Sequence, residues 1–156
     1  MELIVVVVII GILSSIAIPS FQNASDKAKQ KEATTLVSSY LKAAQAHQLE
    51  YGVYANYTRD LGKYISIAGC RRNLPSYCKS ASPVIYTNSM VTKWYSQSGF
   101  YELEITGYPR WVIFARPTGQ YSATGRGVVG CLNYQTGATK ILEMSSPAPQ
   151  LPRINC

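Results

Sequence analysis

Few side chains in this sequence have the types and spacing that catalysis requires. Glu102 and Glu104 alternate along a strand-like run, so both carboxylates face one way, as a general acid and a general base would. A solvated strand face explains them better, because no other polar partner accompanies them. The one histidine, His47, lies in a helix-forming stretch, where we expect it to pack or to face water. We therefore expect no catalytic residue, no metal site and no cofactor.

The four cysteines have the spacing of disulfide partners. Cys70 and Cys78 enclose seven residues, Cys131 and Cys156 enclose twenty-four, and no Cys-x-x-Cys motif is present. Four cysteines allow three connectivities. The proline-rich C-terminal tail has no helical or strand pattern and needs a clamp, so we expect Cys131 to pair with Cys156 and Cys70 with Cys78. A 70–131 or 78–156 linkage, or free buried thiols, are the alternatives. Disulfides would place this part of the chain in an oxidising compartment.

Positive charge accumulates after residue 50. The chain holds 15 Lys and Arg against 8 Asp and Glu, a net charge of +7, and residues 1–50 are neutral overall. Arg71, Arg72 and Lys79 share one loop, and Arg126 lies between two glycines in another. Because cations attract phosphate and aromatic rings stack on unpaired bases, these four residues are candidate nucleic-acid contacts in a tyrosine-rich region. The alternative is that the tyrosines fill the core and the charge keeps the head soluble.

The elements that position these residues begin with a rod. Leu3 to Ile18 is a run of sixteen residues without a charge, which as a helix spans about 24 Å, less than the roughly 30 Å of a bilayer core. The helical pattern continues through 23–52, where apolar residues form one stripe: Ala33, Val37, Tyr40 and Ala44. We expect one helix from Glu2 to Tyr51, ended by Gly52 and weakest at Gly11 and Pro19.

The rest of the chain is expected to form a head. Residues 53–83 are irregular and predict a connecting loop, with a short helical turn near 59–61. Strand-like runs follow at 83–87, 100–106, 111–115, 128–134 and 138–142, and the last two form a hairpin. An antiparallel sheet laid on the Val37 and Tyr40 stripe predicts an α+β fold. The expected parts are a hydrophobic helix at 1–22, an amphipathic helix at 23–52, a connecting loop at 53–83, and a β-sheet head with a disulfide-clamped tail at 84–156.

The N-terminal residues resemble a known family. Glu2 to Phe21, which reads ELIVVVVIIGILSSIAIPSF, is similar to the mature N-terminus of a type IV pilin, and Glu2, Gly11 and Pro19 match in identity and spacing. The match is looser through 22–60, where Lys42 to Gly52 resembles cyanobacterial pilins in particular, and the head matches only in general plan. Family precursors carry a short basic leader and a phenylalanine that becomes N-methylated, so we expect Met1 to be an internal residue.

The resemblance implies a function. It implies a structural subunit of a type IV pilus. A pilus assembly machinery would build copies of the subunit into a homo-oligomeric helical filament through the hydrophobic helix. The filament would serve motility, adhesion or DNA uptake. The chain would lie in the bacterial inner membrane before assembly and in the extracellular pilus, or fimbrium, afterwards. The alternatives are a minor pilin with a DNA-binding or adhesive basic head, and a pseudopilin of a type II secretion system.

The resemblance also implies assembly roles for three positions. Glu2 would meet the N-terminal amine of a neighbouring subunit, and the segment from Gly11 to Pro19 would lose helical structure in the filament. The alternative from physics alone is that Glu2 is a charge at the membrane surface, favoured by the helix dipole. Three lysines follow the apolar run: Lys27, Lys29 and Lys31. Taken alone, they would place the head in the cytoplasm by the positive-inside rule. The cysteines, and the basic leader that precursors of the family carry, favour a head outside.

Overall fold

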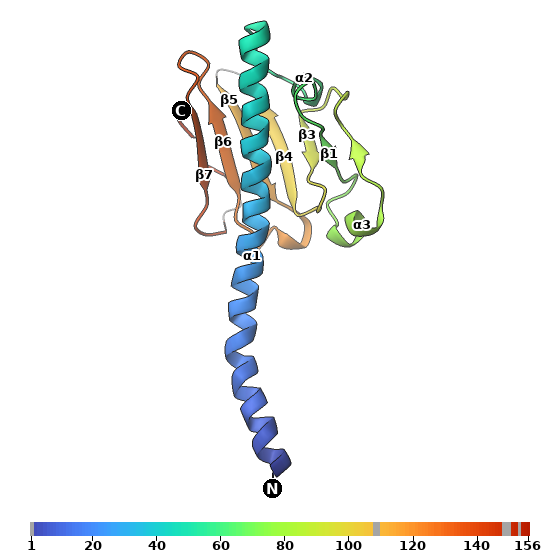
Figure 1. Ribbon diagram of the computed structural model, residues 1–156, viewed down its shortest axis with the longest axis vertical. Helices are drawn as coiled ribbons and strands as arrows, with labels where there is room; N and C mark the ends of the chain where they lie inside the picture. Colours follow the sequence, from blue (N-terminus) through green and yellow to red (C-terminus); the bar gives the residue numbers. More distant parts are fainter. Residues whose placement is uncertain (1, 108–109, 148–150, 153) are drawn as a thin grey trace.

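The computed structural model describes residues 2–107, 110–147, 151–152 and 154–156, and it shows a long helix with a head packed against its second half (Figure 1). Helix α1 runs from Glu2 to Tyr51, 50 residues, which is about 75 Å at roughly 1.5 Å per residue. It passes Gly11 and Pro19 without a break. Gly52, whose φ is 68°, follows the last turn and donates its N–H to the carbonyl of Gln48 at 2.8 Å. The prediction of one continuous helix is confirmed.

A five-stranded antiparallel sheet covers one side of α1. Each strand pairs with the next in sequence, in the order β3-β4-β5-β6-β7. The strands are β3 (Lys93–Tyr95), β4 (Tyr101–Thr106), β5 (Trp111–Pro117), β6 (Val128–Leu132) and β7 (Thr139–Glu143). The predicted α+β arrangement of a long helix on an antiparallel sheet is therefore confirmed. Strand β3 was not among the predicted runs, because three residues are too few to show an alternating pattern.

The segment 53–83, which the sequence predicts to be a connecting loop, carries short elements. Helix α2 covers Thr58–Leu61, where the sequence predicts a helical turn. Strand β1 (Ala68–Gly69) pairs antiparallel with β2 (Val84–Ile85), and helix α3 (Pro75–Ser80) lies between them in the chain. A short 3-10 helix, η1 (Gly119–Tyr121), lies between β5 and β6. The segment is therefore part of the head rather than a simple connection.

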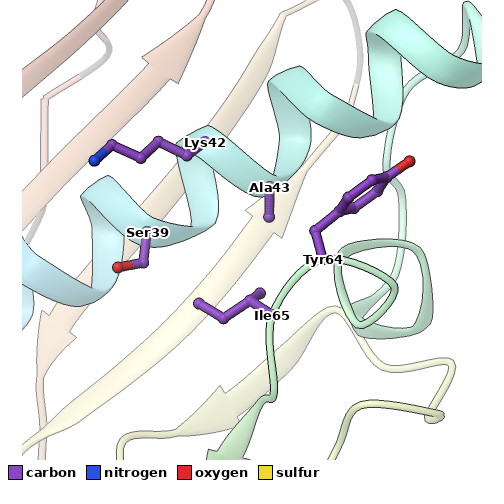
Figure 2. A pocket seen from close by; sticks show the side chains of 5 residues that line it. All are labelled: Ser39, Lys42, Ala43, Tyr64 and Ile65. Atoms are coloured by element: carbon purple, nitrogen blue, oxygen red, sulfur yellow. The ribbon is translucent and has the colours of Figure 1, made fainter.

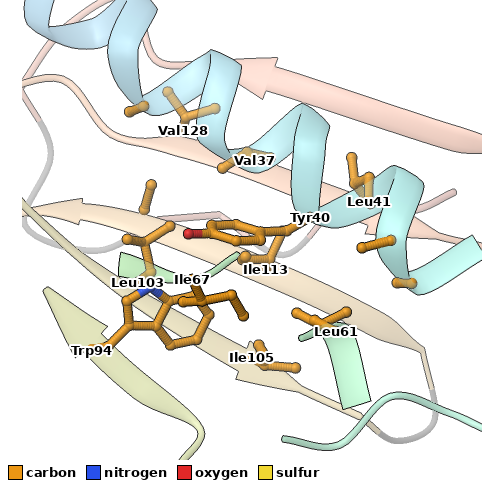
Figure 3. Packing of buried hydrophobic residues seen from close by; sticks show 14 of the residues in the cluster. Val37, Tyr40, Leu41, Leu61, Ile67, Trp94, Leu103, Ile105, Ile113 and Val128 are labelled. Carbon is orange, nitrogen blue, oxygen red and sulfur yellow. The ribbon is translucent and has the colours of Figure 1, made fainter. Parts of the chain in front are cut away.

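The inner face of the sheet and one stripe of α1 form the main core (Figure 3). The four residues of the predicted stripe, Ala33, Val37, Tyr40 and Ala44, are each at most 2% exposed. Apolar side chains from β4, β5 and β6 pack against the stripe, among them Leu103, Ile113 and Val128. The helix lies close to the sheet at Gly130, where a Cβ atom would lie 2.5 Å from Cγ1 of Val37. The missing side chain at this position lets α1 lie directly on β6.

The outer face of the sheet carries a smaller core beneath the C-terminal tail. Val112 of β5 and Val129 of β6 pack with Ile154, and Leu151 lies against the same cluster. Apolar residues on both faces explain why β6 is buried along its whole length. The tail therefore acts as a cover for the outer face of β5 and β6.

Two disulfides close the head. Cys131 of β6 binds Cys156, with their Cα atoms 6.0 Å apart, and so ties the tail to an inner strand of the sheet. Cys70 binds Cys78 of α3, with their Cα atoms 5.5 Å apart, and closes the turn that follows β1. These are the two pairs that the sequence favours.

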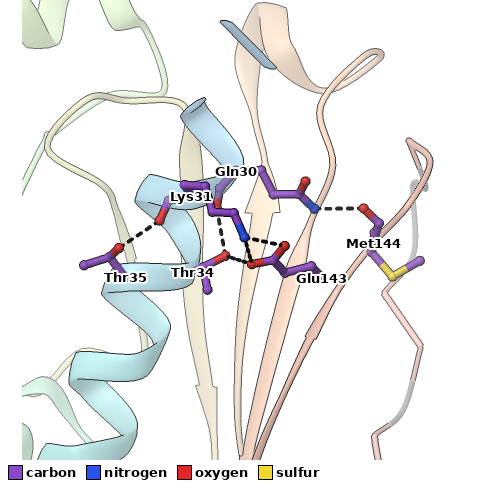
Figure 4. Close-up of polar contacts among 6 residues, drawn as sticks. All are labelled: Gln30, Lys31, Thr34, Thr35, Glu143 and Met144. Atoms are coloured by element: carbon purple, nitrogen blue, oxygen red, sulfur yellow. Dashed lines mark hydrogen bonds and ion pairs between the residues drawn. The ribbon is translucent and has the colours of Figure 1, made fainter. Parts of the chain in front are cut away.

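The edge strand β7 is joined to α1 by polar contacts (Figure 4). The ammonium of Lys31 lies 2.9 Å from a Glu143 carboxylate oxygen, to which the Thr34 hydroxyl donates at 2.7 Å. The hydrogen bonds from Lys31 and Thr34 lower the pKa of Glu143 below its ordinary value. The amide of Gln30 donates to the carbonyl of Met144 at 2.8 Å. Two more glutamines of α1 bind backbone carbonyls of the β6–β7 connection: Gln45 to Gly137 and Gln48 to Tyr134.

Candidate functional site: the exposed apolar stem

The N-terminal part of α1 projects from the head as an apolar rod, here called the stem (residues 3–21; Figure 1). Its large apolar side chains are all exposed, from 51% for Val6 and Ile9 to 81% for Leu3. Exposure at every position from 3 to 10 means that the stem is apolar around its whole circumference rather than along one stripe. Such a helix needs apolar surroundings on all sides, and the head covers none of them.

The stem is too apolar to remain in water. It exposes thirteen large apolar side chains, and each contributes roughly 1.5–3 kcal/mol when fully buried. Residues 3–21 span about 28 Å as a helix, close to the roughly 30 Å of a bilayer core. By length and composition, α1 is apolar enough to cross a membrane. A bundle of identical stems would bury the same surface.

The predicted assembly positions Glu2, Gly11 and Pro19 all lie on this part of α1. Gly11 faces open space: outside the adjacent turns of α1, no atom of the described residues lies within 4 Å of the position that a Cβ would take. A neighbouring helix can therefore approach closely at Gly11. Pro19 has no N–H to donate to the carbonyl of Ser15. The hydroxyl of Ser15 donates to the carbonyl of Ile12 at 2.7 Å. The helix is thus continuous but lacks one backbone hydrogen bond near the end of the stem that is closer to the head.

A cage around Lys29 fixes the point at which the stem meets the head. The Lys29 ammonium lies 3.2 Å from Asp26 Oδ1, 4.5 Å from the centre of the Tyr121 ring and 5.0 Å from that of Phe100. The Tyr121 hydroxyl donates to the carbonyl of Asp26 at 3.2 Å. Cation–π contacts of this kind contribute about 0.5–2 kcal/mol. The sequence does not reveal this cage, because its rings come from loops distant in the chain.

The four predicted nucleic-acid contacts divide between two loops. Arg71 and Arg72 follow β1 and Lys79 lies in α3, so each is within two residues of one end of the Cys70–Cys78 bridge. The Arg72 guanidinium lies 5.0 Å from the centre of the Tyr77 ring. Arg126 precedes β6 and lines a hollow of about 300 Å³ with six other residues: Lys27, Gln30, Lys31, Glu143, Met144 and Ser145.

The two carboxylates of β4 lie on the outer face of the sheet, as their alternation predicts. Glu104 binds Lys93 at 2.9 Å and also binds Arg116. Partial burial raises the pKa of Glu104, but the hydrogen bonds and charges of Lys93 and Arg116 outweigh it and hold the pKa below its ordinary value. The geometry of Glu104 is therefore that of a cross-strand ion pair and not that of a proton donor.

His47 and the grooves offer little chemistry. His47 is 5% exposed, packs 4.9 Å from the centre of the Tyr51 ring, and places Nδ1 3.2 Å from the carbonyl of Val53. A groove of about 290 Å³ beside α1 is lined by Ser39, Lys42, Ala43, Tyr64 and Ile65 (Figure 2). The Tyr64 hydroxyl already donates to Glu50. Within the part of the chain that the structure describes, no three His, Cys, Asp or Glu side chains form a group that could hold a metal ion.

Among these features, the stem is the one that requires a partner outside the chain. The basic loops, the ion pairs and the grooves all tolerate water, whereas the stem does not. No known protein family, characterised protein or solved structure matches the chain. The partner of the stem therefore follows from its own chemistry.

Proposed function

We propose that the chain is a structural subunit of a type IV pilus, a filament whose core is a bundle of stems and whose surface is formed by heads. One observation carries the proposal: a stem that is apolar on all sides continues without a break into a helix packed in a folded head. A membrane anchor alone does not need this continuity, since a flexible linker would serve. A filament benefits from it, because a direct connection without a flexible linker limits where each head can lie, even where part of the stem loses helical structure on assembly. The similarity of Glu2, Gly11 and Pro19 to type IV pilin N-termini supports the same function.

The proposal includes two locations. Before assembly, the stem crosses the bacterial inner membrane and the head lies outside, where disulfides persist. The pilus assembly machinery then moves the stem from lipid into the bundle. Lipid and neighbouring stems bury the same apolar surface, so close packing at small residues such as Gly11 favours the bundle. The finished filament is extracellular and serves motility, adhesion or DNA uptake.

Sheared surface fibres test the proposal. We expect this chain to dominate the fibres, as identified by electron microscopy and by mass spectrometry of the sheared fraction. A fragment of residues 26–156 should be a folded, soluble monomer, because no stem residue belongs to the described core. The proposal would be wrong if that fragment assembled into the same fibre, or if the membrane held the chain and the fibres lacked it. A small share of the chain in fibres made of another subunit would instead indicate a minor pilin.

Glu2 offers the sharpest single-residue test. In apolar surroundings an unpaired carboxylate is penalised, whereas one paired with the N-terminal amine of a neighbouring subunit is strongly attracted to it. Glu2→Gln should leave the head folded and the protein in the membrane. The yield of sheared fibres should fall roughly tenfold or more, since a buried charge that loses its partner costs about 3–5 kcal/mol.

The matched control is Glu50→Gln, which removes the same charge from an exposed position at the other end of α1. It should assemble normally. A normal fibre yield for Glu2→Gln would mean that Glu2 lies at the membrane surface. That result would refute the pairing with the amine but not the filament.

A further inference from the structure

The stem leaves the head beside a set of positively charged side chains, here called the basic collar: Lys27, Arg71, Arg72, Lys79 and Arg126. Helix α3 and the loop that contains η1 both lie at the end of the head from which the stem emerges (Figure 1). The two loops touch there, since Asn73 Nδ2 lies 3.5 Å from Thr118 Oγ1. Arg126 shares a hollow with Lys27 of α1. The collar therefore extends from the disulfide-closed loop to the base of the stem.

The collar keeps its charge. Of the acids at this end of the head, Asp26 binds Lys29 and Glu143 binds Lys31. None of the ion pairs in the described part of the chain includes a collar residue. The five collar residues, these two ion pairs and Glu32 together comprise seven basic and three acidic residues, a net charge of +4. Four of the five collar side chains are exposed, and Arg126 is half-buried.

The distance from the stem places the collar at a membrane surface. When the stem crosses the hydrocarbon core, Phe21 lies at the boundary of that core. Lys27 follows six residues later, about 9 Å further along the helix. A bilayer of about 40–45 Å with a core of roughly 30 Å has headgroup layers of about 5–8 Å on each side. Lys27 therefore lies next to the lipid phosphates, and the loops of the collar are at the same end of the head.

We propose that the basic collar binds the anionic headgroups of the membrane that holds the stem, so that the head rests on the lipid surface until the subunit enters a filament. This inference rests on the membrane insertion included in the proposed function. Basic residues beside a membrane-spanning helix are attracted to anionic lipid, and the attraction falls off within about 10 Å at 0.1 M salt. Nucleic acid carries phosphates too. The membrane is favoured because its flat surface surrounds the stem and would contact both loops and Lys27 at the same time.

Proteoliposomes that contain the full chain test this inference. Vesicles of phosphatidylcholine are compared with vesicles that also contain phosphatidylglycerol, and mass spectrometry measures how fast an amine reagent modifies each lysine. Lys27 and Lys79 should react several-fold more slowly in the anionic vesicles at low salt. The difference should disappear near 1 M salt, where the Debye length falls to about 3 Å. Lys140, exposed in β7 and outside the collar, is the internal reference and should react equally in both.

Paired variants separate the collar from general charge. Arg71→Gln with Arg72→Gln removes two collar charges and should abolish most of the lipid-dependent protection of Lys79. Arg59→Gln with Lys63→Gln removes two charges around α2, at the opposite end of the head, and should leave the protection unchanged (Figure 1).

The outcomes distinguish the collar from the stem. Equal labelling of Lys79 in both vesicles, with the chain still resistant to carbonate extraction, would overturn the collar and leave the proposed function intact. Extraction of the chain by carbonate would mean that the stem is not inserted, which overturns both. Protection of Lys79 by a single-stranded oligonucleotide in neutral vesicles, without protection by phosphatidylglycerol, would assign the collar to nucleic acid and overturn the lipid contact.

Discussion

Gly130 is where the fit between helix and sheet is most open to a direct test. A Cβ at this position would lie 2.5 Å from Cγ1 of Val37, 2.9 Å from Cδ1 of Leu41 and 3.3 Å from Cγ2 of Ile113. Val37 is β-branched and has one preferred rotamer in a helix, so Gly130→Ala requires a shift of α1 or β6. Overpacking costs about 1–3 kcal/mol, and the lower flexibility of alanine in the unfolded chain recovers about 0.5–1 kcal/mol. We expect a net loss of roughly 1–2 kcal/mol in the free energy of unfolding.

Val37→Ala is the complementary change. It removes two buried methyl groups, and at about 0.8 kcal/mol per group plus a cavity contribution it should cost roughly 2 kcal/mol. In the double variant the added methyl group at position 130 occupies the space vacated at position 37. The double variant should therefore be more stable than the sum of the single effects predicts, by about 1–2 kcal/mol.

Urea unfolding of the fragment 26–156, followed by circular dichroism, measures this coupling. Val129→Ala is the matched control, because its side chain lies on the opposite face of β6, so its effect should add to that of Val37→Ala. Additive effects for positions 37 and 130, or a more stable fragment with Gly130→Ala, would refute the direct contact between α1 and β6.

Residues 11–19 should be helical in the isolated subunit and lose helical structure in the filament. An interior proline costs a helix about 3 kcal/mol, and neighbouring stems can replace the lost contacts. A filament map with continuous helix through this segment would contradict this prediction. Cys156→Ser should free the tail and lower the free energy of unfolding by about 2–4 kcal/mol in urea, and peptide mapping without reductant should recover the 131–156 and 70–78 pairs. The pKa of Glu143 is lower in the folded chain than its unfolded-state value of 4.5. The Glu143 carboxylate therefore stabilises the fold fully above pH 4.5, and this stabilisation is lost as the pH falls through the pKa of the folded state. Between about pH 5 and pH 3, the wild-type fragment should therefore lose more stability than Glu143→Gln, and equal losses would show that the contact with Lys31 contributes nothing.

Elements with a repeated pattern could be predicted from the sequence, whereas the short strands β1 and β3, which have none, could not. The stripe of α1 repeats over three turns, and β4 alternates over six residues, so both stand out in the sequence. Strands β1 and β3 have two and three residues, too few for a period, and form because longer neighbours offer them hydrogen-bonding partners. Within the segment 53–83, the sequence therefore predicts the turn at α2 but not strand β1.

The candidate site follows the same division. The stem could be predicted because an absence of charge over sixteen residues is a local property of the sequence. The Lys29 cage could not, since it joins residues about ninety positions apart through the chain reversals of the sheet. The sequence also identifies Arg71 and Arg126 as notable charges, but only the fold brings their loops to the same end of the head.

The Cys131–Cys156 bridge also determines how the head responds to mechanical load. A force applied to the C-terminal tail passes through this bond into β6, which has a hydrogen-bonded strand on each side, and does not peel the edge strand β7 away first. The 25-residue separation of the two cysteines corresponds to about 85 Å of extended chain that cannot be drawn out while the bond is intact. The load then enters α1 where Gly130 lets the helix rest on β6, and continues into the stem. Under tension the head is therefore a stiff link that transmits force without lengthening.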